Sequence, residues 1–411
     1  MHRGSRIIPK FVLGVLLTFS VNSLAALHLR FLYHQGDEFR FYGTSQQVVY
    51  LNGSRLQNNL DTYRVSYKVA QANDQEGRLV GETLYTSQRD GESAHQIDES
   101  FHTDYVCNSL GKYKISSDAV LPVVRGVPTF PDHAVQPGDT WQAPGEERED
   151  FSDIQAFTKA AGRPLPAFPI PLVVNYTYVG PVVKDGKNLQ LLTAEYHLYY
   201  QATVSPSVYP LYPALVTGEV QAKIWFDEQK GHEDSYQDAY RIVLHLNSGE
   251  RLEFDGQSQS RLIQAKLMDK PKVVEEVKKS LEEKGLGNVQ VRTNDKGVVL
   301  NLDNIQFPAD SAELLPSEQE KLNKIGAILK KYPDRDILVE GFTALAGTAK
   351  DRLKLSQDRA AAVGNYLVTI GVRKPEQITY RGWGAEKPIA PNDNEADMKK
   401  NRRVEITILE N

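Results

Sequence analysis

Apolar and polar residues alternate with a period of two through much of the first two thirds of this 411-residue chain, and this feature constrains its fold most. Successive side chains of a strand point to opposite faces, so the alternation is typical of strands with one buried face. It is clearest in five segments, at 28–33, 62–69, 192–200, 220–226 and 240–246. The period therefore predicts a β-rich region.

Turn sequences separate these predicted strands. They include Leu51-Asn52-Gly53-Ser54, Lys184-Asp185-Gly186-Lys187 and Asn247-Ser248-Gly249-Glu250. Asn-Gly and Asp-Gly pairs suit tight two-residue hairpins, so antiparallel meanders are expected. Because proline cannot donate to a strand ladder, the proline-rich segments 164–171 and 206–213 are predicted to be irregular connections. The segment near 120–137 either divides the region into two modules or joins two sheets, and both interpretations stay open.

The first residues have the pattern of a secretory signal. Arg3, Arg6 and Lys10 precede an apolar run at 11–21, and small residues follow up to Ala26. The run is shorter than the ~20 residues of a membrane-spanning helix, so we expect a signal peptide at 1–25 and no helical membrane span. In an exported chain, Cys107 has no second cysteine for a disulfide, and we expect a buried, inert thiol.

Charge and motif content exclude several functions. Lys+Arg number 48 and Asp+Glu 53, so no basic excess favours nucleic acid as a partner. The chain has no His-Glu-x-x-His pair, no Gly-x-Ser-x-Gly elbow and no second cysteine for a thiolate metal site. We therefore expect no catalytic residues, no metal and no cofactor.

The pattern changes after about residue 266, where helical and strand periods alternate. Helices are predicted from Asp269 to about Gly285 and at 317–332, 349–370 and 395–401, with strands at 288–292, 297–307, 336–343, 378–384 and 403–409. Ser317 and Glu320 are predicted to form a capping box. The chain is thus expected to be an α+β multidomain protein, with a signal peptide at 1–25, an antiparallel β-rich region at 26–265 and an α/β sandwich at 266–411.

Five ordered sequence blocks lie within that last region. They are Ile305-Gln306-Phe307 with Asp310 and Pro316, Gly341-Phe342-Thr343 with Gly347, Leu355-Ser356 with Arg359-Ala360, Gly382 and Gly384 with Glu386 and Pro388, and Asn401 to Ile406. Together they resemble the OmpA-like peptidoglycan-binding domain over roughly the last third of the chain. The resemblance does not extend to the β-rich region.

The resemblance implies non-covalent binding of the peptidoglycan stem peptide. In the family, an aspartate after the Gly-x-Thr strand pairs with the ammonium of a zwitterionic diamino acid, and an arginine in the next helix takes its carboxylate. Arg359 matches that arginine, and its guanidinium suits a carboxylate because it donates two parallel hydrogen bonds. A structural salt bridge from Arg359 to a neighbouring carboxylate is the alternative.

The chain departs from the family at the other half of this site. Ala344 stands at the position of the family's aspartate, and Arg352 at that of an asparagine. A methyl group cannot accept a hydrogen bond from an ammonium, and a second cation repels one. Asp351 is the candidate for a displaced carboxylate. Thr343, Ala344, Asp351, Arg352 and Arg359 therefore form a degenerate candidate site, and peptidoglycan binding is expected to be weak, altered or lost.

The leading interpretation is a non-enzymatic, exported envelope protein of the periplasm, associated with the outer membrane and with other envelope proteins. A second keeps the family function, with Arg359 recognising a modified stem peptide. A third makes the front region an outer-membrane β-barrel with a periplasmic OmpA-like tail. Its proline-interrupted segments, which carry charge on both faces, argue against that third interpretation.

Overall fold

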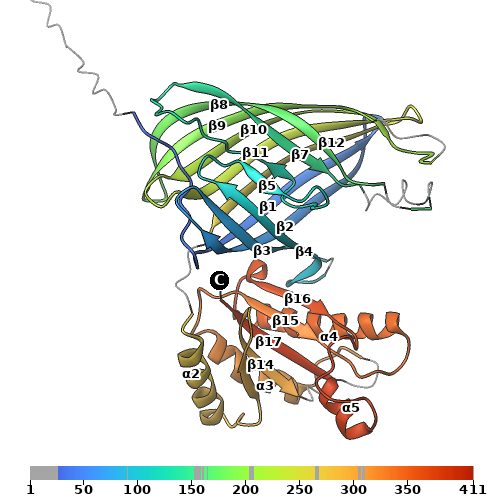
Figure 1. Ribbon diagram of the computed structural model, residues 1–411. Helices are drawn as coiled ribbons and strands as arrows, with labels where there is room; N and C mark the ends of the chain where they lie inside the picture. Colours follow the sequence, from blue (N-terminus) through green and yellow to red (C-terminus); the bar gives the residue numbers. More distant parts are fainter. Residues whose placement is uncertain are drawn as a thin grey trace, which may run out of the picture.

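The computed structural model describes residues 26–89, 91–151, 159, 162–163, 165–202, 208–263, 268–303, 307 and 311–410. The predicted signal peptide at 1–25 lies outside these residues. Within the described ranges, no helix combines the length and the apolar character that crossing a membrane requires. A large strand-rich unit lies on one side of the molecule and a smaller unit of helices and strands on the other (Figure 1).

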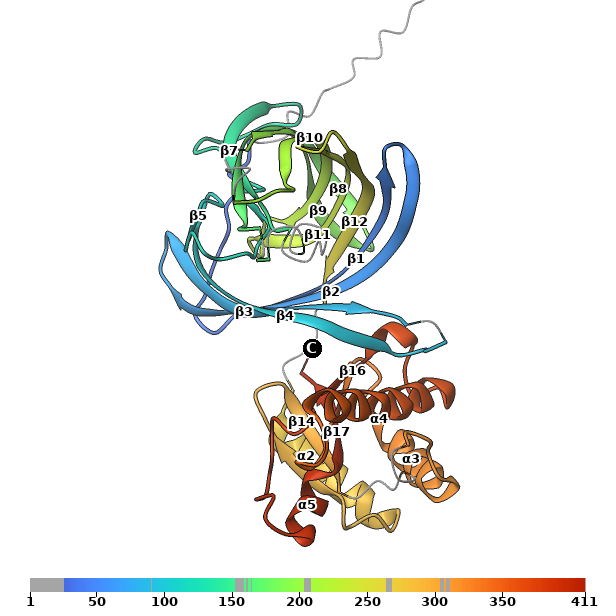
Figure 2. The same ribbon diagram turned by 90° about the vertical axis from the view of Figure 1, so that its right-hand side faces the viewer.

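The strand-rich unit is built on one antiparallel sheet. Its strands are β1 (Glu38–Leu51), β2 (Ser54–Ala72), β3 (Glu76–Ser87), β4 (His95–Asn108), β5 (Tyr113–Ile115), β6 (Val124–Arg125), β7 (Thr140–Glu149), β8 (Phe168–Lys184), β9 (Lys187–Gln201), β10 (Pro213–Asp227), β11 (His232–Leu246) and β12 (Arg251–Leu262). Pairing runs in the order β5-β4-β3-β2-β1-β12-β11-β10-β9-β8-β7-β6. The sheet curls around a concave interior (Figure 2).

The predicted hairpin turns are confirmed. Asn52 and Gly53 join β1 to β2, and Asp185 and Gly186 join β8 to β9, all four with positive φ. Two successive residues with positive φ form the turn whose twist matches the flanking strands. Strands from both sides of the 120–137 segment belong to the same sheet because β1 pairs with both β2 and β12.

The strand predicted at 28–33 is wrong. This segment makes single backbone hydrogen bonds to separate loops, from Phe31 N to Ser109 O and from Leu32 N to Gly231 O. Leu29 is buried, and the Phe31 ring packs edge-on against Phe226 at 5.4 Å. The alternation therefore arises because one side of an irregular segment packs against the interior of the sheet.

The irregular connection predicted at 164–171 is also partly wrong. β8 begins at Phe168, and Pro169 and Pro171 pair with Arg148 and Glu146 of β7. Among the described residues, β8 pairs only with β7 along this stretch, since its pairing with β9 starts at Asn175. A strand paired on one side tolerates proline because a missing N–H facing the open side breaks no ladder bond.

The smaller unit alternates helices and strands as the sequence predicts. It contains α2 (Lys270–Glu283), β13 (Gln290–Thr293), β14 (Gly297–Asp303), α3 (Pro316–Leu329), β15 (Ile337–Gly341), α4 (Ala349–Thr369), the short 3₁₀ helix η1 (Pro375–Gln377), β16 (Ile378–Gly382), α5 (Glu395–Asn401) and β17 (Arg403–Leu409). The sheet order is β13-β14-β17-β15-β16, with β15 and β16 parallel and the other neighbours antiparallel.

The predicted capping box is wrong. α3 begins at Pro316, its N-cap is Leu315, and no side chain caps it. Proline is favoured in the first turn because its fixed φ suits the helix and its missing N–H would have no intrahelical partner there. Ser317 is thus already inside the helix. In contrast, the start predicted at Asp269 is confirmed, because its side chain accepts from Lys272 N at 3.1 Å.

Each unit has its own apolar core. The core of the smaller unit includes Val277, Leu322, Val339 and Tyr380, all fully buried. The core of the strand-rich unit contains most of its tyrosines and phenylalanines that are fully buried, such as Tyr176 and Phe226. Cys107 is buried in a third, small cluster, and burial raises the pKa of its thiol to about 12, as expected for an inert cysteine.

Helix α4 packs unusually close to the sheet beneath it. A Cβ added at Gly341 would lie 2.0 Å from Ser356 O, and one added at Gly382 would lie 2.5 Å from Gln357 N. The two glycines are neighbours in the β15–β16 register. Their missing side chains therefore let the backbone of α4 rest against the ends of both strands.

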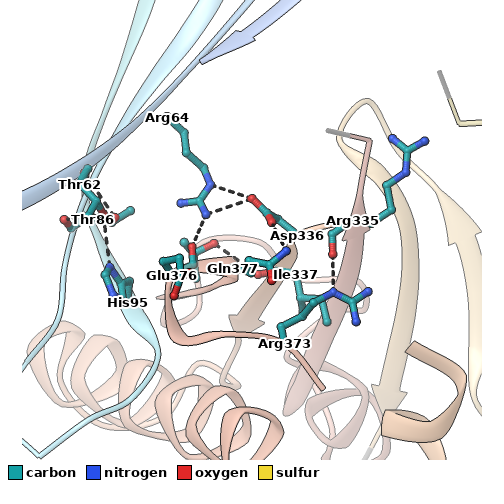
Figure 3. A network of polar contacts seen from close by, with 11 residues as sticks. Thr62, Arg64, Thr86, His95, Arg335, Asp336, Ile337, Arg373, Glu376 and Gln377 are labelled. Carbon is teal, nitrogen blue, oxygen red and sulfur yellow. Dashed lines mark hydrogen bonds and ion pairs between the residues drawn. The ribbon is translucent and has the colours of Figure 1, made fainter. Parts of the chain in front are cut away.

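The two units meet where β4 pairs with β16, through Thr379 with His95 and Tyr380 with Gln96. Arg64 of β2 crosses the junction, with its Nη2 3.0 Å from Asp336 Oδ2 and a hydrogen bond to Glu376 O (Figure 3). Only 13% of the Arg64 side chain and 8% of the Asp336 side chain are exposed. The contact is thus a largely desolvated ion pair that joins the two units.

Replacing Arg64 should be costly because a largely desolvated ion pair with Asp336 would be lost at the junction. We expect Arg64→Ala to lower the free energy of unfolding by about 3 kcal/mol, measured by urea denaturation. Arg78→Ala is the matched control, since Arg78 pairs with Asp104 where 44% and 38% of the side chains are exposed. It should cost much less than Arg64→Ala, because an exposed ion pair is solvated and screened by salt. Equal effects of the two variants would contradict the structural role of the junction.

The close packing of α4 should make Gly341 intolerant of a side chain. We expect Gly341→Ala to destabilise the protein by about 3 kcal/mol or more, because a backbone carbonyl occupies the place of the new methyl group. Thermal unfolding of Gly341→Ala and Gly287→Ala would be compared. A Cβ at Gly287 meets only Glu282 Cγ, at 3.9 Å. A normal melting temperature for Gly341→Ala would show that α4 does not pack as described.

Candidate functional site

The candidate site lies at the carboxyl ends of the parallel strands β15 and β16, where the chain enters α4. The backbone continues the sheet contacts beyond the strands, with Trp383 N donating to Gly341 O at 3.0 Å and Thr343 N donating to Gly384 O at 2.8 Å. Ser356 Oγ of α4 accepts from Gly384 N at 2.8 Å. These bonds hold the loop at 342–348 and the first turns of α4 against each other.

Thr343 and Ala344 are both buried in this loop. The Thr343 hydroxyl has no hydrogen-bond partner among the described residues, although its oxygen is inaccessible to solvent. Only 4% of Ala344 is exposed. The position of the family's aspartate is therefore occupied by a buried methyl group, and residues 342–348 contain no carboxylate.

Asp351 and Arg352 close the loop onto the start of α4. Thr348 Oγ1 accepts from Asp351 N at 3.2 Å and donates to Asp351 Oδ2 at 2.6 Å. Arg352 Nη1 donates to Gly347 O at 2.6 Å. An acidic residue in the first turn also interacts favourably with the helix dipole. The Asp351 carboxylate is thus engaged in capping the helix.

Arg359 lies on the same face of α4 as Arg352, about two turns further along the helix. Its side chain is half-buried. Nε donates to Ser311 O at 3.1 Å, and the guanidinium carbon lies 5.0 Å from the centre of the Phe307 ring. These contacts hold the guanidinium against the segment that follows β14. Residues 304–306 and 308–310 of the first sequence block lie outside the described residues.

Two asparagines support the loop from its other side. Asn392 Oδ1 accepts from Leu345 N at 3.0 Å and from Asn401 Nδ2 at 3.1 Å. Asn401 is fully buried, and its Oδ1 also accepts from Ile389 N and Ala390 N. Asn401 belongs to the fifth sequence block, whereas no sequence signal pointed to Asn392.

Arg403 forms a second buried contact beside the loop. Its guanidinium carbon lies 3.7 Å from the centre of the Phe342 ring, and its Nε donates to Glu405 Oε1 at 2.8 Å. Arg292 also contacts Glu405, at 2.6 Å. Glu405 thus interacts with two cations, and the loop residue next to Thr343 packs on one of them.

The structure brings the five predicted residues to one region. Thr343 and Ala344 come from the strand-following loop, Asp351 and Arg352 from the first turn of α4, and Arg359 from two turns later. The arrangement supplies a cation for a carboxylate ligand. It supplies no carboxylate from the loop for an ammonium, and Asp351 already accepts a hydrogen bond from Thr348.

Comparison with known proteins gives matches to this part of the chain. The OmpA family profile matches residues 306–402 and leaves the region before it unmatched. A probable lipoprotein of Escherichia coli K12, YiaD, is 35% identical over 136 residues, which are 33% of this chain and 61% of that protein. A peptidoglycan-associated lipoprotein of Pseudomonas aeruginosa is 32% identical over 120 residues, which are 29% of this chain and 70% of that protein.

Other matches also cover only a quarter to a third of this chain. The peptidoglycan-binding protein ArfA of Mycobacterium tuberculosis is 38% identical over 104 residues, or 25% of this chain and 32% of that protein. The chain thus spans less than two thirds of YiaD and ArfA. An outer membrane protein structure from Borrelia burgdorferi B31 is 38% identical and covers 29% of this chain and 96% of its own, with a TM-score of 0.25.

The family assignment rests on the sequence matches. The matched residues contain the loop at 342–348, α4 with Arg359, and Asn401. Through this C-terminal domain, which occupies the last quarter to third of the sequence, the chain belongs to the OmpA family.

Proposed function

We propose that this chain is an exported, non-enzymatic protein of the cell envelope, which associates with peptidoglycan through its OmpA domain with reduced or altered affinity. Relatives named peptidoglycan-associated lipoprotein and peptidoglycan-binding protein support the ligand class. The predicted signal peptide supports export. The periplasm, at the outer membrane, is the proposed location.

The proposal of an altered affinity depends on one observation, the burial of Ala344 at the position of the family's aspartate. An ammonium that leaves water needs an acceptor, and a methyl group provides none. Loss of one partner from a desolvated charged contact costs about 2–5 kcal/mol, which corresponds to roughly 30-fold to several thousand-fold in affinity. We therefore infer that the site holds a stem peptide mainly by its carboxylate, with the ammonium left unpaired.

Arg359 supplies the remaining half of this interaction. Its Nε and ring contacts fix the guanidinium on α4, while a forked donor takes a carboxylate with two hydrogen bonds. A stem peptide whose ammonium is modified would lose no binding energy at this site. Recognition of such a modified peptide through Arg359 is therefore the alternative function.

Restoring the missing carboxylate should restore binding. We expect Ala344→Asp to increase the affinity of the chain from Ala26 onward for insoluble diaminopimelate-type peptidoglycan about 30-fold or more, measured by co-sedimentation. Ala344→Asn is the matched control because it adds nearly the same volume without charge. Circular dichroism would establish that both variants are folded. Strong sedimentation of the wild type with no gain in Ala344→Asp would contradict the degenerate site.

Arg359 should carry the binding that the restored site gains. We expect Arg359→Ala in the Ala344→Asp background to lower the affinity for peptidoglycan at least tenfold, since the ligand's carboxylate would lose its bidentate donor. Arg359→Lys should recover only part of it, because an ammonium cannot reproduce the fork. Lys354→Ala removes an exposed cation of the same helix, paired with Asp358 at 2.5 Å, and should leave co-sedimentation unchanged. Equal losses in Arg359→Ala and Lys354→Ala would point to net charge instead of a specific site.

A further inference from the structure

A cavity on the concave side of the β-rich sheet has walls made largely of aromatic rings. Its volume is about 200 Å³. Eight aromatic side chains line it together with Glu233 of β11: Phe31, Tyr33, Phe39, Phe41, Tyr63, Tyr67, Tyr105 and Tyr113. A second cavity of about 280 Å³ shares Tyr63, Val65, Tyr67 and Val127 with it. Together they reach the ~300–1,000 Å³ typical of small-molecule sites.

Glycines hold two of these rings in place. A Cβ at Gly43 would lie 2.1 Å from Cζ of Tyr63, its partner in the β1–β2 register. A Cβ at Gly77 would lie 2.6 Å from Cγ of Tyr33. The rings therefore lie directly over strand backbone that carries no side chain. The aromatic wall is a consequence of specific residues in facing strands, and its rings are held in position before any ligand arrives.

The rings also contact one another. Tyr67 packs edge-on against Tyr105 at 5.8 Å, and Tyr105 lies 4.9 Å from Tyr113. Aromatic faces carry a negative quadrupole, and several faces around one space attract a cation. The described residues that line the cavity include no lysine and no arginine. The aromatic faces thus favour a cation in the cavity, and no cationic side chain of the described lining occupies it.

Glu233 is the one carboxyl group in this lining. Within the described part of the chain, its carboxyl makes no hydrogen bond or ion pair, and the residue is partly exposed and lines the cavity. Burial raises its pKa to about 7. An ionised carboxylate in such surroundings is costly unless a cation pairs with it.

The groups around Glu233 are uncharged near neutral pH. They are His232 and Tyr236 of its own strand β11, together with Tyr33, Tyr67, Tyr105, Cys107, Tyr113 and Tyr176 from the surrounding segments. Burial raises the pKa of each tyrosine and of the thiol, and it lowers the pKa of His232. No protein cation in this set neutralises the Glu233 carboxylate.

We propose that this cavity binds an organic ammonium ion with apolar substituents, held by the aromatic faces and by the carboxylate of Glu233. Such a ligand supplies the charge that Glu233 lacks and fills apolar space at once. An anionic ligand would be repelled by the carboxylate and by the ring faces. A neutral apolar chain would fill the space and leave the carboxyl group unpaired.

The test uses a pair of probes of equal shape, choline and 3,3-dimethylbutan-1-ol, in which carbon replaces the charged nitrogen. We expect the wild-type chain to bind choline about tenfold or more tightly than the alcohol, measured by calorimetric titration and ligand-observed NMR. Equal affinities, or no choline binding up to about 10 mM, would overturn the proposal. Preference for the alcohol would identify the cavity as a site for neutral apolar ligands.

The role of Glu233 gives a second readout. The affinity for choline should rise about tenfold between pH 6 and pH 8, because the carboxyl must lose its proton to pair with the cation. Glu233→Gln should abolish both this pH dependence and the preference for choline. Glu195→Gln removes the same charge from an exposed position on β9 and should change neither. If Glu233→Gln does not fold, the wild-type pH profile decides, and a flat profile contradicts the proposal.

Discussion

The contact between α4 and the ends of β15 and β16 determines the geometry of the OmpA domain. Gly341 and Gly382 leave no side chain between the helix and the sheet, so Ser356 bonds directly to the backbone at Gly384. This contact sets where the loop at 342–348 lies relative to Arg359. Because the helix is held by its backbone, the position of Arg359 does not depend on the side chain at position 344.

Stability and ligand binding are therefore separable in this domain. The loop is fixed by Thr348, Asn392 and Asn401, which satisfy backbone groups and need no ligand. A buried alanine at position 344 suits such a loop, since an unpaired carboxylate there would need a cation or a proton. The loop therefore keeps its bonded structure with an alanine at position 344.

Much of the smaller unit could be predicted from sequence because its signals are local. Helical periods and the Asp269 cap located α2, and the five blocks located the OmpA domain. The capping box failed because Pro316 starts α3 one residue earlier than Ser317 would. The contacts of Asn392 and the burial of Thr343 depend on segments distant in sequence, and no local pattern reports them.

In the β-rich region the period of two identified strands but not their neighbours. The segment at 28–33 has the same period because one side of it packs on the interior, as Phe31 does on Phe226. Glu233 has no sequence signal at all, since its surroundings come from β2, β4, β5 and the segment before β1. The ion pair between Arg64 and Asp336 could not be predicted for the same reason, because the two residues are 272 positions apart in the sequence.

We propose that the site of the OmpA domain recognises a carboxylate and lacks an acceptor for the ammonium. The most direct measurement is calorimetric titration of the wild-type chain with two soluble stem peptides, one with a free diaminopimelate ammonium and one with that nitrogen acetylated. We expect equal dissociation constants within about twofold, since a factor of two corresponds to less than ~0.5 kcal/mol. Binding of the free ammonium form tenfold more tightly would require an acceptor in the protein and would show that the site is not degenerate.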